Sequence, residues 1–461
     1  MSFSSPKSRR INHGTYGVHT LATRVSDYSH TVLEIPFKTI FERYGKEFGP
    51  GFQWTDEHRH LHFASWGTST EFGRPSTPDS QRNQAGSLPR EGLQELFTEL
   101  RTILPDECHT LPIGYFANRF DIDRSGDRET PWAHWPQTIF CLPRVAIVEG
   151  SDGVVHEFRF GSKSVNLQRQ PNKDPQSQYQ NVPATNWSFN ESKTAWGQRV
   201  TAVERACRNE EIGKVVLAHS ATHRIAQTER LDIHETMTRL KARNRDSIVF
   251  CLPWEGDYFV GATPEILAEL DAGKLQTHAL AGTMAIHGGG TGDDMLTDAK
   301  LLREHACVVD EVVAELSVFC SAIAVAHQPA VRRLSTMAHL QTPIQATVAD
   351  HISILDVALR LHPTPALAGA PRREAMAWLR ESEPLDRGYY GGPIGLFNAL
   401  GEGICAVAIR SGLLTALGAT AFAGAGIVEG SMAGDEWDET TLKMDTFQSC
   451  IASHEAAGDS P

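Results

Sequence analysis

The sequence lacks paired cysteines, long apolar runs and clusters of basic residues. Its eight cysteines are scattered and none belongs to a Cys-x-x-Cys pair, which argues against a disulfide framework or a thiolate zinc site and fits a reducing compartment. The 20 histidines form no His-Glu-x-x-His motif and no Cys/His cluster along the chain, which argues against zinc catalysis. No stretch of about 18 uncharged apolar residues occurs, so no membrane span is expected.

The balance of charge excludes two further classes of partner. The formal net charge is −13, and no Lys/Arg-rich run is present, so binding to nucleic acid or to an anionic membrane is not expected. The first residues contain no apolar segment of the kind found in signal peptides, which favours a cytoplasmic protein.

The pattern of expected strands and helices favours an α+β fold. The chain has 461 residues, of which 41% are hydrophobic, enough for a large core. Strands are expected at 139–148, broken by Pro143, with a hairpin partner at 154–160, and at 214–218, 247–252, 258–261, 403–410 and 419–423. Helices are expected near 196–213 and over 298–326, 372–382 and the C-terminal segment. Because strands come in runs rather than in strict βαβ alternation, mostly antiparallel sheets are predicted.

A polar segment at 166–186 is the best candidate for a boundary. We therefore divide the chain into an N-terminal part of the fold, residues 1–190, and a catalytic region, residues 191–455.

The last third of the chain carries two carboxylates and a lysine at helical spacing. Glu436, Glu439 and Lys443 would share one helix face, and a glycine-rich turn at 422–428 precedes them. Two glutamates can hold a hard cation such as Mg²⁺, and backbone amides at the turn can hold a carboxylate. The alternative is a solvent-exposed face of ordinary salt bridges.

Several segments occur in an order that resembles the chorismate-utilising enzyme family, which contains anthranilate, aminodeoxychorismate, salicylate and isochorismate synthases. The resemblance is dense over about residues 190–450 and looser before them. The segments are KVVLAH (214–219), ATPE (262–265), LAGT (280–283), EH (304–305), HLQT (339–342), LHPTPA (361–366), RGYYGGPIG (387–395), AIRS (408–411), AGAGIV (423–428) and Glu436, Glu439 and Lys443.

The resemblance implies a fold, a metal and a substrate. It implies a single large domain in which two mainly antiparallel β-sheets are stacked and flanked by helices, and it implies Mg²⁺ and chorismate. The implied metal ligands are Glu304, Glu436 and Glu439. The implied substrate-binding residues are Gly282, Thr283, Ala366, Tyr390, Arg410, Gly424, Gly426 and Lys443. The implied catalytic residues are Lys214, Glu265 and His339.

Three positions favour the isochorismate synthase type. Members that add water resemble this chain in carrying a lysine at Lys214, whereas members that add ammonia carry glutamine. Lys214 would take a proton from the water that attacks C2, Glu265 would protonate the departing C4 oxygen, and His339 would assist. Ala366 differs from the threonine of members that expel pyruvate. The expected activity is therefore isomerisation of chorismate to isochorismate, by a monomer without a glutaminase subunit.

Other members of the family remain alternatives. A salicylate synthase would share Lys214 and Glu265 and then eliminate pyruvate, and an anthranilate or aminodeoxychorismate synthase is less consistent with Lys214. A non-catalytic relative is disfavoured because the glutamates persist. The sequence does not choose between menaquinone, siderophore and salicylate biosynthesis. One departure is His219, where the family usually has arginine.

Overall fold

The computed structural model describes residues 28–33, 37–38, 44, 51–72, 90–124, 130–160, 180–181, 186–226, 229–285, 292–333 and 337–455. The helices are α2 (Arg90–Ile103), η1 (Asp106–Cys108), α3 (Lys193–Arg208), α4 (Ile233–Arg243), η3 (Asp293–Leu296), α5 (Ala299–Leu316), α6 (Ile354–Leu361), α7 (Arg372–Ser382) and α8 (Ala433–Gln448). The strands are β1 (Tyr28–Leu33), β2 (Phe52–Asp56), β3 (Leu61–Phe72), β4 (Gly114–Asn118), β5 (Thr138–Glu149), β6 (Val155–Phe160), β7 (Gln180–Asn181), β8 (Ser188–Phe189), β9 (Lys214–Arg224), β10 (Glu229–Leu231), β11 (Ile248–Trp254), β12 (Asp257–Thr263), β13 (Ile266–Asp271), β14 (Lys274–Ala285), β15 (Cys320–Val325), β16 (Ala330–Arg333), β17 (Met337–Val348), β18 (Gly369–Ala370), β19 (Pro393–Phe397), β20 (Gly403–Val407), β21 (Ser411–Thr415), β22 (Gly418–Ile427) and β23 (Ala452–Glu455).

The strands confirm the predicted α+β fold with mainly antiparallel sheets. Twenty of them form one hydrogen-bonded network, and β10, β23 and β7 form a separate three-stranded sheet. Long antiparallel pairs such as β9–β22 and β14–β17 dominate the network. The strands expected in two stacked sheets are connected, because β11 pairs with both β12 and β2, and β19 pairs with both β20 and β4.

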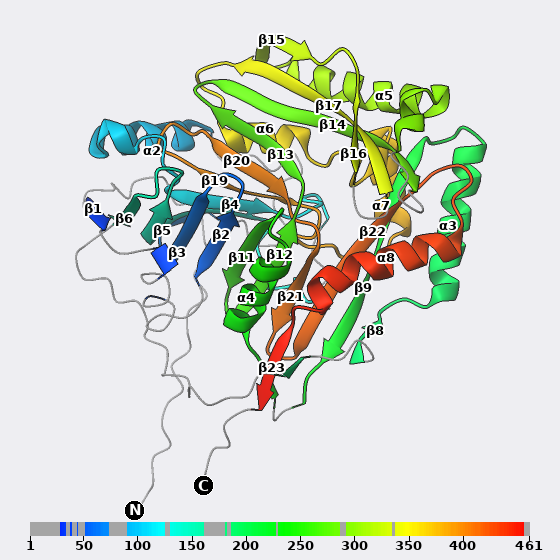
Figure 1. The fold of residues 1–461 in the computed structure, drawn as a ribbon, viewed down its shortest axis with the longest axis horizontal. Helices are drawn as coiled ribbons and strands as arrows, with labels where there is room; N and C mark the ends of the chain where they lie inside the picture. The colour runs from blue at the N-terminus through cyan, green and yellow to red at the C-terminus, as the bar shows by residue number, and fades with distance from the viewer. Residues whose placement is uncertain are drawn as a thin grey trace, which may run out of the picture.

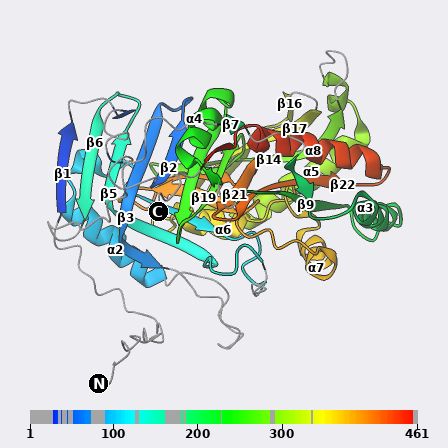
Figure 2. The same cartoon turned by 90° about the horizontal axis from the view of Figure 1, so that it is seen from below.

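These two connections join the chain on either side of residue 190. In the β2–β11 pair Trp54 lies opposite Phe250, and in the β4–β19 pair Phe116 lies opposite Gly395. All four residues are in strands of the same sheet, and side chains from both parts of the chain share one hydrophobic core. The N-terminal part is therefore integral to the sheet that carries the site (Figures 1 and 2).

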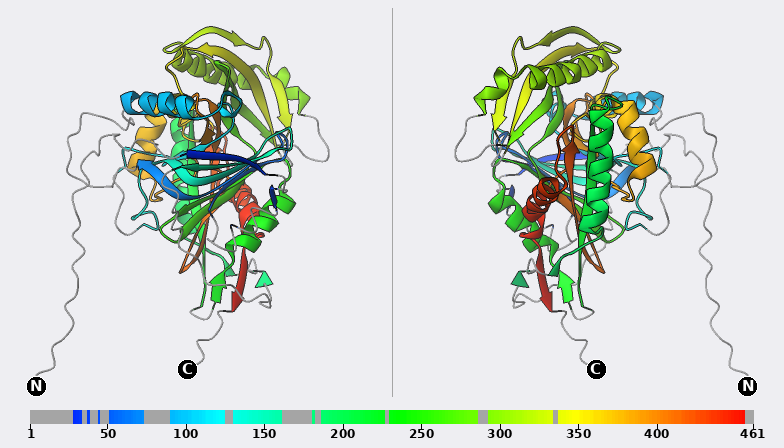
Figure 3. Two further views of the ribbon diagram at one scale, coloured as in Figure 1. Left: turned by 90° about the vertical axis from the view of Figure 1, so that its left-hand side faces the viewer. Right: turned by 90° about the vertical axis from the view of Figure 1, so that its right-hand side faces the viewer.

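Two helices position the residues discussed below. Helix α8 packs on β22 and beside α3, and Figure 1 shows it crossing in front of β22 and β9. Helix α5 lies along β14 and β17, as the side views of Figure 3 also show. Val308, Val312 and Leu316 form the buried stripe of α5, as the predicted helical period requires.

Several predicted element boundaries were wrong. The helix expected near 196–213 spans Lys193–Arg208, and the strand expected at 214–218 continues to Arg224. The helix expected over 298–326 ends at Leu316, and Cys320–Val325 instead pairs with β17 as β15. The strand expected at 403–410 ends at Val407. Pro143 does not break its strand: it lies inside β5 opposite Thr68, beside the register shift between Thr68 and Thr70. A bulge is a position where the missing N–H of proline disturbs a ladder least.

Candidate active site

A cavity of about 260 Å³ lies where β9 and β22 meet α8, β14 and β17. Most of the site residues predicted from the sequence line it together: Lys214, Glu265, His339, Ala366, Tyr390, Arg410, Gly424, Gly426, Glu436, Glu439 and Lys443. Gly282 lies at a register shift of β14, with a φ of +70°, just after the lining residues Leu280 and Ala281. The backbones of Thr283 and Glu304 belong to β14 and α5, but their side chains lie outside what the structure describes.

Lys214 reaches the cavity over a glycine of the neighbouring strand. It begins β9, where Val216 lies opposite Gly426 of β22. A β-carbon on Gly426 would be 2.5 Å from Cε and 3.1 Å from Nζ of Lys214. Gly426 thus leaves the space that the lysine side chain fills. The 422–428 segment, expected to be a turn, is therefore mostly strand, and its glycines make room within β22 rather than at a helix entry.

Glu265 lies between β12 and β13 and faces four cations. Its pKa is raised because burial disfavours the carboxylate, and the nearby positive charges of Arg332, Lys214, Lys443 and Arg410 oppose that rise. Its backbone carbonyl accepts a hydrogen bond from the amide of Val407 at 3.0 Å. No helix starts here, since β13 follows directly, so the side chain is not capping a helix.

The predicted carboxylate and lysine face of α8 is turned toward the cavity. Lys443 Nζ lies 2.5 Å from an oxygen of Glu439 and donates to the carbonyl of Gly424 at 2.9 Å. Burial raises the pKa of Glu436 to about 7, and the neighbouring charge of Glu439 adds to the rise. The side chains of Glu439 and Lys443 are only 27% and 22% exposed, so this is not the open salt-bridge face of the alternative interpretation.

Arg410 and Tyr390 also line the cavity. Arg410 follows β20 with a φ of +51°, a conformation that costs a non-glycine residue about 1 kcal/mol or more. Burial lowers its pKa, against the attraction of Tyr390, Glu439 and Glu265. Burial also raises the pKa of Tyr390 to about 12, and its ring stacks on Phe422 at 5.6 Å. The guanidinium and the phenol can both donate hydrogen bonds.

The sequence did not point to Arg332, which also lines the cavity. It lies on β16 opposite His339 of β17 and donates to the carbonyl of Pro264 at 2.7 Å. Burial lowers the pKa of His339 to about 4, and the positive charges of Lys214 and Lys443 lower it further. His339 is therefore a neutral imidazole at pH 7. No motif marks Arg332, since only the β16–β17 pairing brings it to Glu265.

A buried ion pair supports the strand of Lys214 and the loop of Ala366. Arg387 binds Glu383 with N–O distances of 2.5 and 2.8 Å, and both side chains are about 2–3% exposed. Arg387 also donates to the carbonyls of Val216 and Leu367 at 2.6 and 2.9 Å, and Glu383 accepts from the amide of Ala218. The pair thereby fixes β9 against the segment that precedes β18.

His219, the departure from the family pattern, supports α8 instead of binding a carboxylate. Its Nε2 lies 2.7 Å from the hydroxyl of Thr440 on α8, and its ring stacks on Trp196 at 4.4 Å. Burial lowers its pKa to about 3, so the ring is uncharged. The guanidinium of Arg199 lies over the ring of Trp196 and donates to the carbonyl of Ala218, so a positive charge is still present near this strand.

The fold and this cavity define a class of protein. The family model described as chorismate binding enzyme matches residues 18–452, and the chain belongs to that family. The predicted family membership is thereby confirmed. Among the described residues, no helix is both long and apolar enough to cross a bilayer.

Individual relatives show which members of this family the chain is similar to. The chain is 35% identical over 268 residues to the salicylate biosynthesis isochorismate synthase of Pseudomonas aeruginosa, an alignment that covers 57% of this chain and 56% of that relative. It is 27% identical over 473 residues to the isochorismate synthase MenF of Bacillus subtilis, covering 96% and 95%. The solved structure of MenF, the menaquinone-specific isochorismate synthase from Escherichia coli, has a TM-score of 0.70 at 22% identity, covers 92% of this chain and 94% of that one, and shows the same fold.

Proposed function

We propose that this protein is an isochorismate synthase that converts chorismate to isochorismate with Mg²⁺. The observation that supports this most directly is the position of Lys214 and Glu265, a base and an acid of the required types, on the wall of one cavity. The names of the relatives point to the same reaction.

Lys214 and Glu265 have complementary tasks in the proposed reaction. An unprotonated Lys214 accepts a proton from water, the water oxygen bonds to C2 of the ring, and the double bonds shift. Glu265 gives its proton to the C4 oxygen, which leaves as water. The raised pKa of Glu265 supports this role, because burial favours the protonated acid. Neutral His339 can share a hydrogen bond with the ring or the departing hydroxyl without adding charge.

Glu436 and Glu439 suit a magnesium ion, with Glu304 as a further expected ligand. Two carboxylates line the cavity, and because burial raises the pKa of Glu436, a cation beside it would favour its charged form. Oxygen ligands of this kind are those that Mg²⁺ prefers. When bound, the ion neutralises the ring carboxylate of chorismate and fixes its position.

The second carboxylate of chorismate, on the enolpyruvyl arm, would bind Arg410 and Tyr390. An arginine fork matches a carboxylate in two parallel hydrogen bonds. Lys443 adds positive charge, and the backbone amides of Gly282, Thr283, Gly424 and Gly426 would donate hydrogen bonds to the remaining oxygens. We add Arg332 to this set, since it lines the same cavity.

Product identification from chorismate and Mg²⁺ tests the proposal. We expect isochorismate, with no anthranilate when ammonia is supplied. Salicylate, detected by fluorescence, would favour the salicylate synthase alternative, which Ala366 argues against. The Lys214→Ala variant should lose turnover and still bind chorismate in a Mg²⁺-dependent way. Lys274→Ala, which removes an exposed lysine bound to Thr347, is the matched control. Normal turnover by Lys214→Ala would exclude the proposed base.

A further inference from the structure

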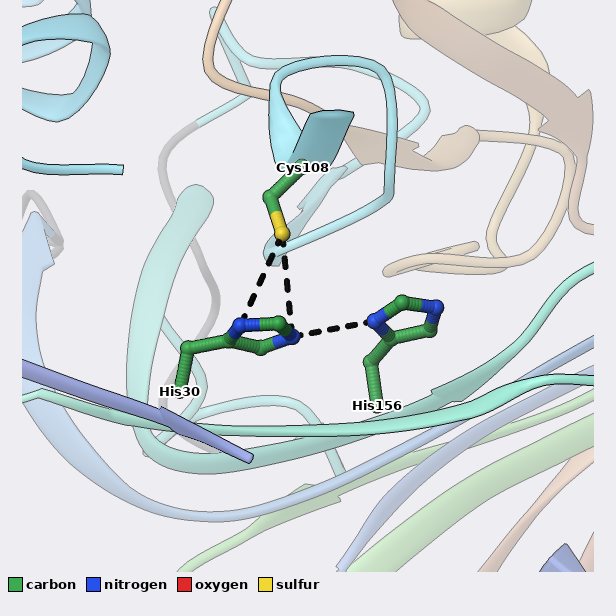
Figure 4. Close-up of side chains that lie close together, drawn as sticks. All are labelled: His30, Cys108 and His156. Atoms are coloured by element: carbon green, nitrogen blue, oxygen red, sulfur yellow. Dashed lines mark hydrogen bonds between the residues drawn. The ribbon is translucent and has the colours of Figure 1, made fainter. Parts of the chain in front are cut away.

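A second group of metal-ligating side chains lies outside the cavity, where β1 and β6 meet η1. Figure 4 shows His30, Cys108 and His156 pointing toward one another. His30 Nε2 is 3.0 Å from His156 Nδ1 and 3.6 Å from the sulfur of Cys108. One ligand atom from each residue lies within 4.8 Å of the other two. No sequence motif indicates this group, because 126 residues separate the two histidines.

The strand register accounts for the convergence. His30 lies opposite Phe158, and His156 lies opposite Val32 two positions further along the β1–β6 pair. Since side chains alternate across a strand, both imidazoles project from the same face of the sheet. Their rings stack at 5.3 Å. Cys108, the last residue of η1, is fully buried and its sulfur points toward the imidazoles.

Two of the three distances between the ligand atoms are close to those of a tetrahedral zinc site. Zn–N bonds of about 2.0–2.1 Å and a Zn–S bond of about 2.3 Å place two nitrogens roughly 3.3 Å apart and nitrogen and sulfur roughly 3.6 Å apart. To bind an ion, the two imidazole nitrogens would move slightly apart, and the ligand atoms of Cys108 and His156, which lie within 4.8 Å of each other, would come to roughly 3.6 Å. We propose that His30, Cys108 and His156 bind a single Zn²⁺ ion. A water molecule would complete the four ligands.

Binding changes the protonation of the group in a defined way. Without an ion, one of the two facing imidazole nitrogens carries the hydrogen of their hydrogen bond. With the ion, both nitrogens donate lone pairs, so each ring keeps its hydrogen on the other nitrogen. The Cys108 thiol binds as the thiolate and loses its proton. One proton is therefore released to solvent for each ion bound at neutral pH.

The ion would hold the edge strand β1 in its place in the sheet. Strand β1 pairs with β6 and lies at the margin of the sheet in Figure 2. The three ligands come from three separate elements, so an ion bound to all of them favours the folded arrangement over any in which β1 detaches. The alternative is simple packing, in which the stacked rings and the thiol contact one another without a ligand.

Cobalt titration of the full-length protein separates these interpretations. Co²⁺ replaces Zn²⁺ as a spectroscopic probe, and an excess of Mg²⁺ occupies the carboxylates of the cavity. We expect a near-ultraviolet thiolate-to-cobalt band that saturates at one equivalent, disappears on adding Zn²⁺ and is absent from Cys108→Ser. Cys307→Ser, which removes an exposed cysteine, should keep the band. No band in the wild type, or a band that persists in Cys108→Ser, would overturn the proposal.

A second measurement remains informative if Cys108→Ser fails to fold. Zn²⁺ should raise the thermal unfolding midpoint of the wild type and leave that of His156→Gln unchanged, because the half-buried His156 tolerates an amide. His58→Gln, at an exposed histidine that faces Asp246, should respond as the wild type does. An equal rise in His156→Gln would show that the ion binds elsewhere. Chorismate turnover is not a readout in either experiment.

Discussion

The side chain of Lys214 on β9 fills the space that a side chain at Gly426 on β22 would occupy: a β-carbon on Gly426 would lie 2.5 Å from Cε of Lys214. The side chain of Lys214 is flexible, so it can move away from an added methyl group at little cost in stability. The proposed base is therefore positioned by the absence of a side chain on the neighbouring strand.

The Gly426→Ala substitution should displace the amine without unfolding the protein. We expect kcat to fall by about 100-fold, since a misplacement of about 1 Å can cost that much, while the thermal unfolding midpoint changes little. Gly434→Ala, at a position on α8 where an added β-carbon meets no atom within 4 Å, serves as control. Unchanged kcat in Gly426→Ala would mean that the position of Lys214 does not limit the reaction.

The Glu439→Gln substitution should weaken the dependence on Mg²⁺. Removing one carboxylate should raise the Mg²⁺ concentration for half-maximal activity by at least roughly tenfold, as measured by titration of initial rates. Asp438→Asn alters the adjacent residue of α8, whose side chain is 78% exposed, and should leave the titration unchanged. A wild-type titration curve for Glu439→Gln would remove it from the proposed ligands.

The Arg332→Gln substitution should shift the pH–rate profile toward alkaline pH. The positive charge of Arg332 lowers the pKa of Glu265, which burial raises, so its removal leaves that pKa higher. An acid that must be protonated then stays active to higher pH. The descending limb of kcat/KM should therefore move up in pH. Arg333→Gln, at an exposed neighbour bound to Asp293, should not move it; an identical shift in both variants would contradict the assignment.

The Glu383→Ala substitution should destabilise the fold strongly. It leaves the guanidinium of Arg387 buried without its carboxylate partner, which typically costs about 3–5 kcal/mol. Urea unfolding should detect this loss. Arg373→Ala removes a residue of an ion pair in which the arginine side chain is 91% exposed, where the expected change is below about 1 kcal/mol. Similar losses in the two variants would show that the buried pair has no special role.

The sequence predicted the family and most of the cavity because its motifs are local and ordered. Glu436, Glu439 and Lys443 lie within two turns of one helix, so their spacing alone indicates a shared face. Their roles, and those of Lys214 and Glu265, remain predictions until the variants are measured.

What the sequence did not predict depends on long-range pairing. The apolar residues after Leu316 continue a helical pattern, yet 320–325 forms a strand because β17 offers it an edge. Arg332 becomes a cavity residue only through the β16–β17 pair. His30 and His156 become neighbours only through the β1–β6 register. In each case the partner strand, not the local sequence, decides the outcome.

The pairing of β2 with β11 and of β4 with β19 also limits which parts of this protein can be removed or exchanged. A protein truncated to the residues after 190 would expose the unpaired edges of β11 and β19. Such edges commonly pair with other chains, so the truncated protein would be expected to aggregate. A chimera that uses the part of the chain after residue 190 would therefore also need the first part, or another segment that supplies the same two strands.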